Sequence, residues 1–147
     1  MSDDVTMERA GLRPEPQGEE ARGSEAGEGV EAGEGVGRTV YVAGPMTGMP
    51  DWNRAAFARA AERLGRDGWT VYDPVEIGEM YGEPAELADD PELLALVIRA
   101  ELGFVARADA IYLLDGWERS VGAKRELQVA LACGVELILE TRAEVHR

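Results

Sequence analysis

The chain has 147 residues, 45% of them hydrophobic, and a formal net charge of −14 at pH 7. This length allows one domain with a hydrophobic core and little else. An acidic chain with no basic stripe argues against nonspecific DNA or RNA binding, which requires cations that neutralise phosphates. A small anionic nucleotide remains compatible with the charge, because local amides and one or two arginines can outweigh the overall field.

A single cysteine, Cys133, and a single histidine, His146, limit the kinds of site that the chain can build. No intrachain disulfide can form, and a zinc site, which draws on clusters of these residues, is disfavoured. The sequence shows no apolar run of about 18 residues or more and no signal-peptide pattern. We therefore expect a cytoplasmic protein that does not enter a membrane.

Residues 1–37 are rich in Gly, Glu and Pro and contain two consecutive copies of the hexapeptide EAGEGV, at Glu25–Val30 and Glu31–Val36. Such a segment buries too little apolar surface to offset the entropy lost on ordering. It is predicted to be a disordered acidic tail that precedes a single domain over residues 38–147. The tail either solubilises the protein or binds a basic partner.

The domain is predicted to begin with a buried strand over Thr39–Ala43, followed by a loop over residues 44–51. A helix is expected over Trp52–Arg66, because small and apolar residues recur there at helical spacing. Asp51 is its expected N-cap, and Gly68 lies just beyond its end.

A second short strand over Trp69–Tyr72 is predicted to run into a turn at Asp73. Residues 74–90 are expected to form a short helix and an acidic loop. Asp90 is a good N-cap, and the proline after it suits a first helical position, so a helix is predicted from there to about Arg107.

A strand over Ala110–Leu114, a helix over Val121–Cys133 and a last strand over Val135–Leu139 complete the domain. This alternation predicts an α/β fold, a doubly wound flavodoxin- or Rossmann-like parallel sheet of four to five strands flanked by helices. Ligands of such sheets bind at the carboxyl ends of the strands. One rim is therefore expected to carry three connections, at residues 44–51, 73–76 and 115–122.

Glu126 is the first candidate for chemistry, because it lies one helical turn beyond Gly122 in the segment Ser120–Glu126. Its side chain would point back toward the helix N-terminus, where free amides favour an anion. There its pKa is expected to be depressed, which would keep the carboxylate ionised as a nucleophile. The plain alternative is a solvated surface glutamate.

Glu101 and Tyr41 are further candidates, because each lies among apolar neighbours. Glu101 either pairs with Arg99 or Arg107 at the edge of the core, or acts as the second carboxylate of an acid–nucleophile pair. Tyr41 is either a core residue of the first strand or a residue whose hydroxyl orients a carboxylate.

The remaining polar and aromatic residues near the rim admit two interpretations each. Trp52 and Trp117 are either lids that stack on a ligand or exposed aromatic residues, and the sequence does not choose between them. Arg119 and Lys124 flank the turn before the last helix, where solvated surface charge is the default. Asp109 is expected to be structural, capping the turn before its strand.

Three stretches together resemble the nucleoside 2-deoxyribosyltransferase superfamily, and most closely its small phage and bacterial deoxyribosyltransferase-like domains of unknown function. The stretches are Thr39–Gly48 (TVYVAGPMTG), Gly68–Pro74 (GWTVYDP) and Ala108–Glu126, which ends in the run S-x-G-x-x-x-E. The resemblance spans residues 38–140 and leaves out the tail.

The resemblance implies roles for individual residues. Glu126 corresponds to the superfamily's nucleophile, Tyr41 to the tyrosine that positions it, and Glu101 to the acid that handles the departing base, which is usually an Asp. Relatives that hydrolyse nucleoside 5′-monophosphates carry Ser where this chain has Ser120, whereas an Asp there would repel a phosphate. The expected substrate-binding residues are Gly44, Met46, Asp73, Trp117, Ser120 and Gly122.

The activity implied by the resemblance is cleavage of the N-glycosidic bond of a (deoxy)nucleoside 5′-monophosphate or nucleoside, by hydrolysis or base transfer. Such retaining chemistry needs two carboxyl groups about 5 Å apart. It requires no metal and no cofactor, and a homo-oligomer is expected. Two other functions stay open: a non-catalytic nucleotide-binding module, and a phage or host interaction protein that works through its acidic tail.

Overall fold

The structure is a computed structural model that describes residues 33–141. The predicted disorder of residues 1–32 lies outside the described residues. Residues 33–37, assigned above to the tail, form a turn that packs on the loop after the first long helix. The backbone N–H of Gly35 donates to the carbonyl of Asp67 at 3.1 Å, and the N–H of Arg38 donates to the carbonyl of Gly35 at 2.8 Å. The folded part of the chain therefore starts a few residues earlier than predicted.

Four parallel strands form one sheet in the order β3-β2-β4-β5, so the predicted doubly wound α/β fold is confirmed. Tyr41 lies at the centre of the sheet, opposite Tyr72 on one neighbouring strand and opposite Ile111 on the other. The strands are β2 (Thr39–Ala43), β3 (Thr70–Tyr72), β4 (Ala110–Leu113) and β5 (Glu136–Leu139).

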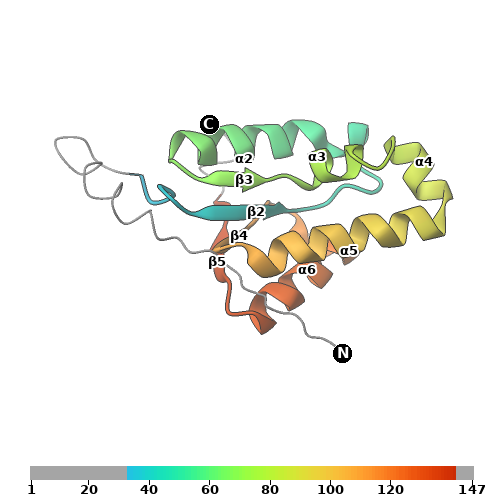
Figure 1. The fold of residues 1–147 in the computed structure, drawn as a ribbon. Coiled ribbons are helices and arrows are strands. Elements are labelled where there is room, and N and C mark those ends of the chain that lie inside the picture. The colour runs from blue at the N-terminus through green and yellow to red at the C-terminus, as the bar shows by residue number, and fades with distance from the viewer. Residues whose placement is uncertain (1–32, 142–147) are drawn as a thin grey trace, which may run out of the picture.

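Helices cover the two faces of the sheet unequally, as Figure 1 shows for α2 on one side and for α5 and α6 on the other. Helix α3 contacts both β2 and α5, and α4, which directly precedes α5 in the chain, packs against α5. The helices are α2 (Arg54–Arg66), α3 (Pro74–Glu79), α4 (Pro84–Asp89), α5 (Pro91–Arg107) and α6 (Val121–Ala132). Two short 3-10 turns, η1 (Pro50–Asn53) and η2 (Trp117–Arg119), precede α2 and α6.

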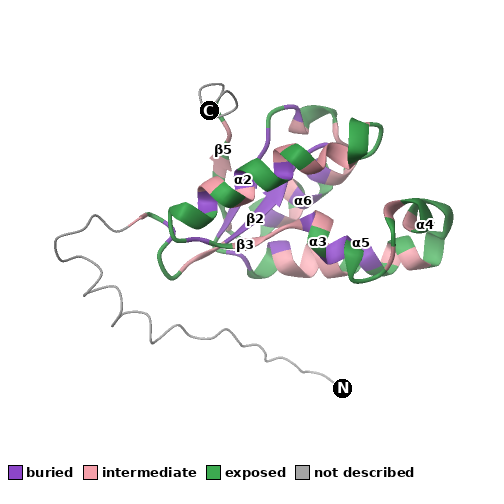
Figure 2. Cartoon of the chain, turned by 90° about the horizontal axis from the view of Figure 1, so that it is seen from above, coloured by how far each residue is buried: buried purple, intermediate pink, exposed green. Residues whose placement is uncertain are grey.

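The alternation of side chains along β2 divides the hydrophobic core into two parts. Val40 and Val42 face α2 and pack with Phe57, whereas Tyr41 and Ala43 face the helices on the other side. All four strand side chains are buried, and Figure 2 shows buried residues concentrated on the strands and the inward faces of the helices. The first strand thus supplies both faces of the core and one functional candidate.

Two local predictions were wrong. Asp51 is not an N-cap, because residues 51–53 adopt left-handed backbone conformations (φ of 50°, 56° and 61°) and α2 starts only at Arg54. Residues 74–90 contain two helices rather than a helix and a loop. The second of these begins at Pro84, and the backbone N–H of its N-cap, Glu83, donates to the Glu86 carboxylate at 2.8 Å.

Asp109 has a structural role, but its partner lies on another strand. Its carboxylate accepts hydrogen bonds from the backbone N–H of Thr39 at 2.8 Å and from the Thr39 hydroxyl at 3.2 Å. The N–H of Asp109 in turn donates to that hydroxyl at 3.1 Å. These bonds join the amino ends of β2 and β4, away from the expected ligand rim.

None of the helices within residues 33–141 is both long and apolar enough to cross a membrane.

Gly44, directly after β2, is required by close packing rather than by its backbone angles. A Cβ atom there would lie 2.7 Å from Cδ1 and 2.8 Å from Cβ of Leu114, which follows β4. We expect Gly44→Ala to lower the free energy of unfolding by about 1–3 kcal/mol, the usual cost of overpacking a core. Urea denaturation would measure the change.

Gly65→Ala is the matched control, because a Cβ at that position in α2 meets no atom within 4 Å. Alanine has the higher helix propensity, so this variant should be at least as stable as the wild type. Equal stability of the two alanine variants would contradict the packing argument at Gly44.

Candidate functional site

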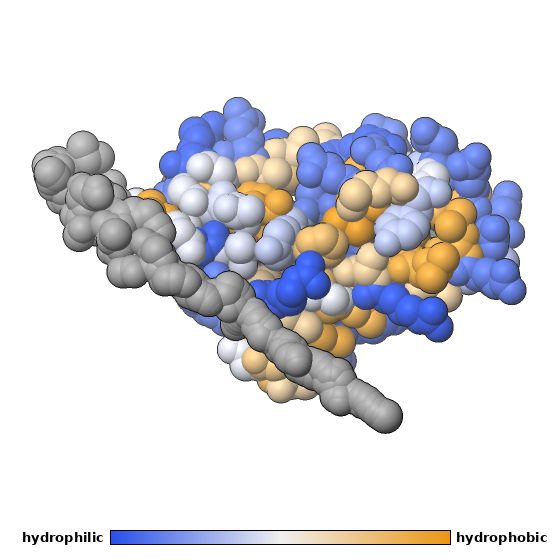
Figure 3. Space-filling model, viewed as in Figure 1, coloured by the Kyte–Doolittle hydropathy of each residue, from blue (hydrophilic) through white to orange (hydrophobic). Residues whose placement is uncertain are grey.

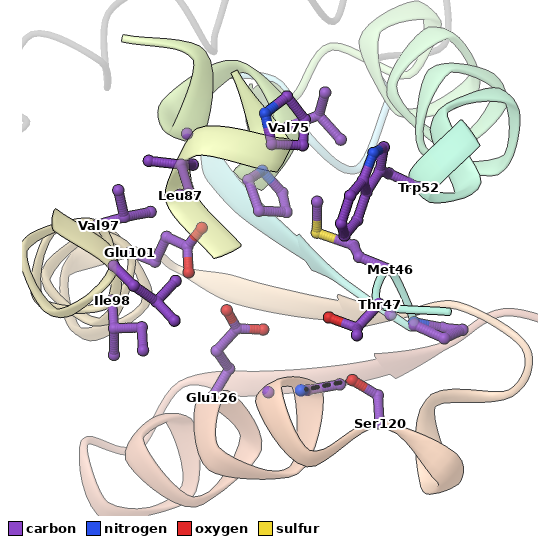
Figure 4. Close-up of a pocket in the computed structure, with 18 of the residues that line it drawn as sticks. Met46, Thr47, Trp52, Val75, Leu87, Val97, Ile98, Glu101, Ser120 and Glu126 are labelled. Carbon is purple, nitrogen blue, oxygen red and sulfur yellow. Dashed lines mark hydrogen bonds between the residues drawn. The ribbon is translucent and has the colours of Figure 1, made fainter. Parts of the chain in front are cut away.

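A cavity of about 660 Å³ opens at the carboxyl ends of the strands, where the sequence places the ligand rim. Its wall is formed by the loop after β2, by α3, α4 and α5, and by the N-terminal turn of α6. Figure 4 shows side chains from these separate segments pointing into one space. Such a volume is typical of pockets that bind small organic ligands.

Glu126 lies at the inner wall of this cavity and is bound to Tyr41. Glu126 on α6 is 8% exposed and is the only buried charged residue among residues 33–141. The fully buried Tyr41 donates its hydroxyl to Oε2 of Glu126 at 2.7 Å, which joins residues 85 positions apart. Burial raises the pKa of Tyr41 well above its ordinary value, so the hydroxyl keeps its proton and acts as a donor.

Glu101 reaches the same cavity from α5, and Figure 4 shows its carboxyl group facing that of Glu126. The alternative interpretation, an ion pair with Arg99 or Arg107, is not seen among the described residues: neither arginine pairs with Glu101, and the Arg107 guanidinium stacks over the ring of Phe104 at 4.6 Å. The cation that acts on Glu101 is instead Arg125, whose charge lowers the pKa of that carboxyl group. Two carboxyl groups thus face each other across one cavity.

The pKa of both carboxyl groups is raised, which corrects the depressed value expected for Glu126. Burial raises the pKa of Glu101 to about 7. Burial, reinforced by the charge of Glu101, raises the pKa of Glu126 to about 8, although the bond from Tyr41 and the charge of Arg125 act in the opposite direction. Loss of hydration outweighs the amides at the helix N-terminus. The charges of the two groups are therefore coupled, and the pair still carries a proton near neutral pH.

The first turn of α6 leaves room for a ligand. Ser120 is its N-cap, since its Oγ accepts from the backbone N–H of Ala123 at 3.0 Å. A hydroxyl that accepts this bond still has its own proton to donate. At Gly122 an added Cβ would meet only Oγ of Ser120, at 3.9 Å, so the cavity side of this residue is open. Free amides, a hydroxyl and open space are suited to an anionic group.

The turn before α6 is held in place from the edge of the sheet. Glu140, just after β5, accepts from the backbone N–H of Asp115 at 2.8 Å. Its other oxygen accepts from Arg63 at 2.9 Å, and the same guanidinium nitrogen donates to the Tyr112 hydroxyl at 2.9 Å. The Glu140 side chain is only 9% exposed. This cluster of Arg63, Tyr112, Asp115 and Glu140, the edge cluster, connects α2, β4 and the end of β5.

The loop after β2 forms the opposite wall. Gly44 and Met46 line the cavity as predicted, and Thr47 lies beside them. Trp52 projects over the cavity from the left-handed turn at residues 51–53, as Figure 4 shows. The side-chain amide of Asn53 donates to the carbonyl of Pro45 at 2.9 Å and ties this turn to the loop.

Two predicted substrate-binding residues do not belong to the cavity wall as the structure describes it. Asp73 is the N-cap of α3, and its carboxylate accepts from the backbone N–H of Val75 at 2.9 Å. Trp117 packs partly buried against the core under α6. Lys124 also lies outside the wall, whereas Arg119 is part of it. An N-cap turns its oxygen toward its own helix, which explains the placement of Asp73.

Some wall residues were missed from the sequence. Arg125 follows the predicted turn but carried no signal that separates it from other surface cations. Val97 and Glu101 lie four positions apart on α5, a spacing that could have placed them on one face. Leu87 was missed because its segment was predicted to be a loop.

Among residues 33–141, the side chains of Asp, Glu, Cys and His nowhere gather in a group of three or more that could hold a metal ion.

Removing the buried charge should stabilise the protein in alkaline solution. The folded protein retains protons that the unfolded chain releases above the ordinary carboxyl pKa of 4.5, so wild-type stability falls as the pH rises from about 4.5 to about 8. Glu126→Gln removes the part of this loss that comes from Glu126 and leaves the part that comes from Glu101. Its advantage over the wild type should grow across that window to a few kcal/mol, at about 1.4 kcal/mol per pKa unit.

Urea denaturation of both proteins at several pH values would measure this difference. Glu118→Gln is the matched control. It makes the same chemical change, but Glu118 lies on η2 and its carboxylate is exposed to water. If the two variants showed the same dependence on pH, the burial of Glu126 would not be the cause.

Comparison with known families places the chain in one of them. Residues 38–139 match the model of a domain of unknown function, DUF4406. The match covers more than half of the chain, so the protein belongs to this family. A search of curated proteins finds no match to the chain.

Proposed function

We propose that the protein cleaves the N-glycosidic bond of a (deoxy)nucleoside 5′-monophosphate or nucleoside, with Glu126 as the nucleophile. The observation that carries the proposal is the buried Glu126 carboxyl group, held by Tyr41 at 2.7 Å and facing Glu101 across an open cavity. Burying a carboxyl group weakens a fold, so a structural role alone gives no reason to keep this arrangement. The resemblance of the Ser120–Glu126 run to the nucleoside 2-deoxyribosyltransferase superfamily supports the same reaction.

The first step transfers the sugar to the protein. A carboxylate oxygen of Glu126 forms a bond to the anomeric carbon, while the bond from that carbon to the base nitrogen breaks. The electron pair of the broken bond stays with the base, and Glu101 gives the base a proton. The products are a glycosyl ester of Glu126 and the neutral base, and Glu101 is left as a carboxylate.

The second step releases the sugar. Water attacks the anomeric carbon, and the Glu101 carboxylate takes its proton as the ester bond breaks and its electron pair returns to Glu126. A second base in place of water would give base transfer instead. Two displacements at one carbon retain its configuration.

The raised pKa values fit a pair that carries one proton between its two members. Tyr41 donates only to Glu126, and a donor stabilises the ionised form of the group that accepts its bond. Glu126 has the higher pKa of the two, about 8 against about 7, so the resting pair holds its proton preferentially on Glu126. The proposed reactive form is the other arrangement, with the proton on Glu101 and the charge on Glu126, and the bond from Tyr41 favours it. Arg125, which lowers the pKa of both groups, would limit the range of pH over which this form is present.

A 5′-phosphate would bind at the first turn of α6. The hydroxyl of Ser120, the amides beside Gly122 and the guanidinium of Arg119 lie on the same part of the wall. These groups lie at the end of the cavity away from Glu101, as Figure 4 shows for Ser120. The sugar would then span the distance between the phosphate and the two carboxyl groups.

The decisive test incubates the protein with a panel of nucleosides and their 5′-monophosphates and measures released base by chromatography. At least one substrate should yield free base, and Glu126→Gln should lower the rate by 1,000-fold or more, on the order seen when a covalent nucleophile is removed. If Glu126→Gln cleaved as fast as the wild type, the mechanism would be wrong. Binding without any released base would favour a non-catalytic nucleotide-binding module.

Gly122→Ala should separate ligand binding from folding. Gly122 lines the cavity, and an added methyl group there would meet only Oγ of Ser120, at 3.9 Å, so it would fill space beside the proposed phosphate position. Alanine also raises helix propensity, so the variant should fold at least as stably and bind nucleotide much more weakly. Gly103→Ala in α5 is the matched control, because its methyl group makes only an ordinary 3.6 Å contact with Arg107 outside the cavity. Unchanged nucleotide affinity in Gly122→Ala would place the ligand elsewhere.

A further inference from the structure

The cavity is chemically divided along its length. Beyond Glu101 it continues between α3, α4 and α5, and Figure 4 shows aliphatic side chains around this part. We refer to these residues as the aliphatic end; they are Val75, Leu87, Ala88, Leu94, Val97 and Ile98. Leu94 is 38% exposed, so this end also reaches the surface. Figure 3 shows hydrophobic residues gathered where α4 meets α5.

Polar groups are concentrated at the other end. Within the described residues, α3, α4 and α5 contribute only two polar side chains to the wall, Glu79 and Glu101. Glu79 is already paired with the guanidinium of Arg54. The hydroxyls and the remaining cations of the wall come instead from the loop after β2 and from the region around the start of α6.

This division limits which bases the site can take. In the proposed reaction the base lies next to Glu101, so its edge remote from the sugar enters the aliphatic end. The remote edge of an unmodified base carries amino and carbonyl groups, and burying these without partners is unfavourable. An apolar group on that edge would instead displace water from aliphatic walls.

We propose that the preferred substrate is a nucleotide whose base carries an alkyl or other apolar substituent on the edge remote from the sugar. The inference rests on the proposed function, which places the base next to Glu101. The preference for an apolar substituent follows from the apolar side chains that line the aliphatic end. Each methylene buried there should tighten binding about fourfold, the factor that corresponds to the transfer of one methylene from water.

The test measures affinity without turnover. Glu126→Gln is titrated calorimetrically with deoxyadenosine and deoxycytidine 5′-monophosphates whose exocyclic amino group is free or carries a methyl, ethyl or propyl chain. In at least one series the dissociation constant should fall about threefold to fourfold per carbon. Equal or weaker binding of the alkylated nucleotides in both series, or no binding by any of them, would overturn the proposal.

A second variant tests the location. Val97→Thr keeps nearly the same shape but adds a hydroxyl to the aliphatic end, so it should reduce the gain per carbon. Val71→Thr on β3 is the matched control, because Val71 packs with the α2 side of the core. The gain per carbon should be unaffected there, and an equal reduction in both variants would argue against the aliphatic end as the site.

The two proposals fail in different ways. If alkylated nucleotides bind more tightly but the wild type releases no base, the preference stands for ligand binding alone and the catalytic function is wrong. If the wild type releases base from unmodified nucleotides and alkylation gives no gain in affinity, the function stands and the preference is wrong.

Discussion

The burial of one carboxyl group, that of Glu126, is the constraint on which the rest of the site depends. Removing it from water raises its pKa to about 8 and would be costly without a partner. The hydroxyl of Tyr41 supplies that partner from the central strand of the sheet. Because both groups are buried, α6 must dock on β2 in one register for the bond to form. The free energy lost by burying the carboxyl group is therefore linked to the geometry that holds it at the wall of the cavity.

The topology explains how residues distant in sequence meet. Strands β2 and β4 are the two central strands, and the helices after β3 and β4 return over the same face of the sheet. Glu101 lies in the middle of α5, the first turn of α6 follows β4, and Tyr41 lies on β2. A parallel sheet brings these positions to one edge. The opposite face, covered by α2, contributes mainly core packing and the left-handed turn that carries Trp52.

Much of the architecture could be predicted, because apolar periodicity locates buried elements without tertiary information. The strands and α5 match their predicted spans within a residue or two, and Glu101 and Tyr41 were recognised as polar groups in apolar surroundings. The acidic segment that forms α4 was missed because its stability comes from capping rather than from periodicity. The left-handed turn at residues 51–53 has no glycine to signal it. The pKa of Glu126 was expected to shift the wrong way, since its sign depends on how much burial the fold imposes, and spacing alone does not give that.

The edge cluster has a consequence for the order in which the site is built. The N–H of Asp115, in the turn before α6, finds its partner only in Glu140, which follows the last strand. The chain as far as α6 therefore contains Glu126, Tyr41 and Glu101, but not the residue that secures the turn between β4 and α6. The pocket is therefore secured only when β5 joins the sheet, although β5 contributes none of the residues of the cavity wall.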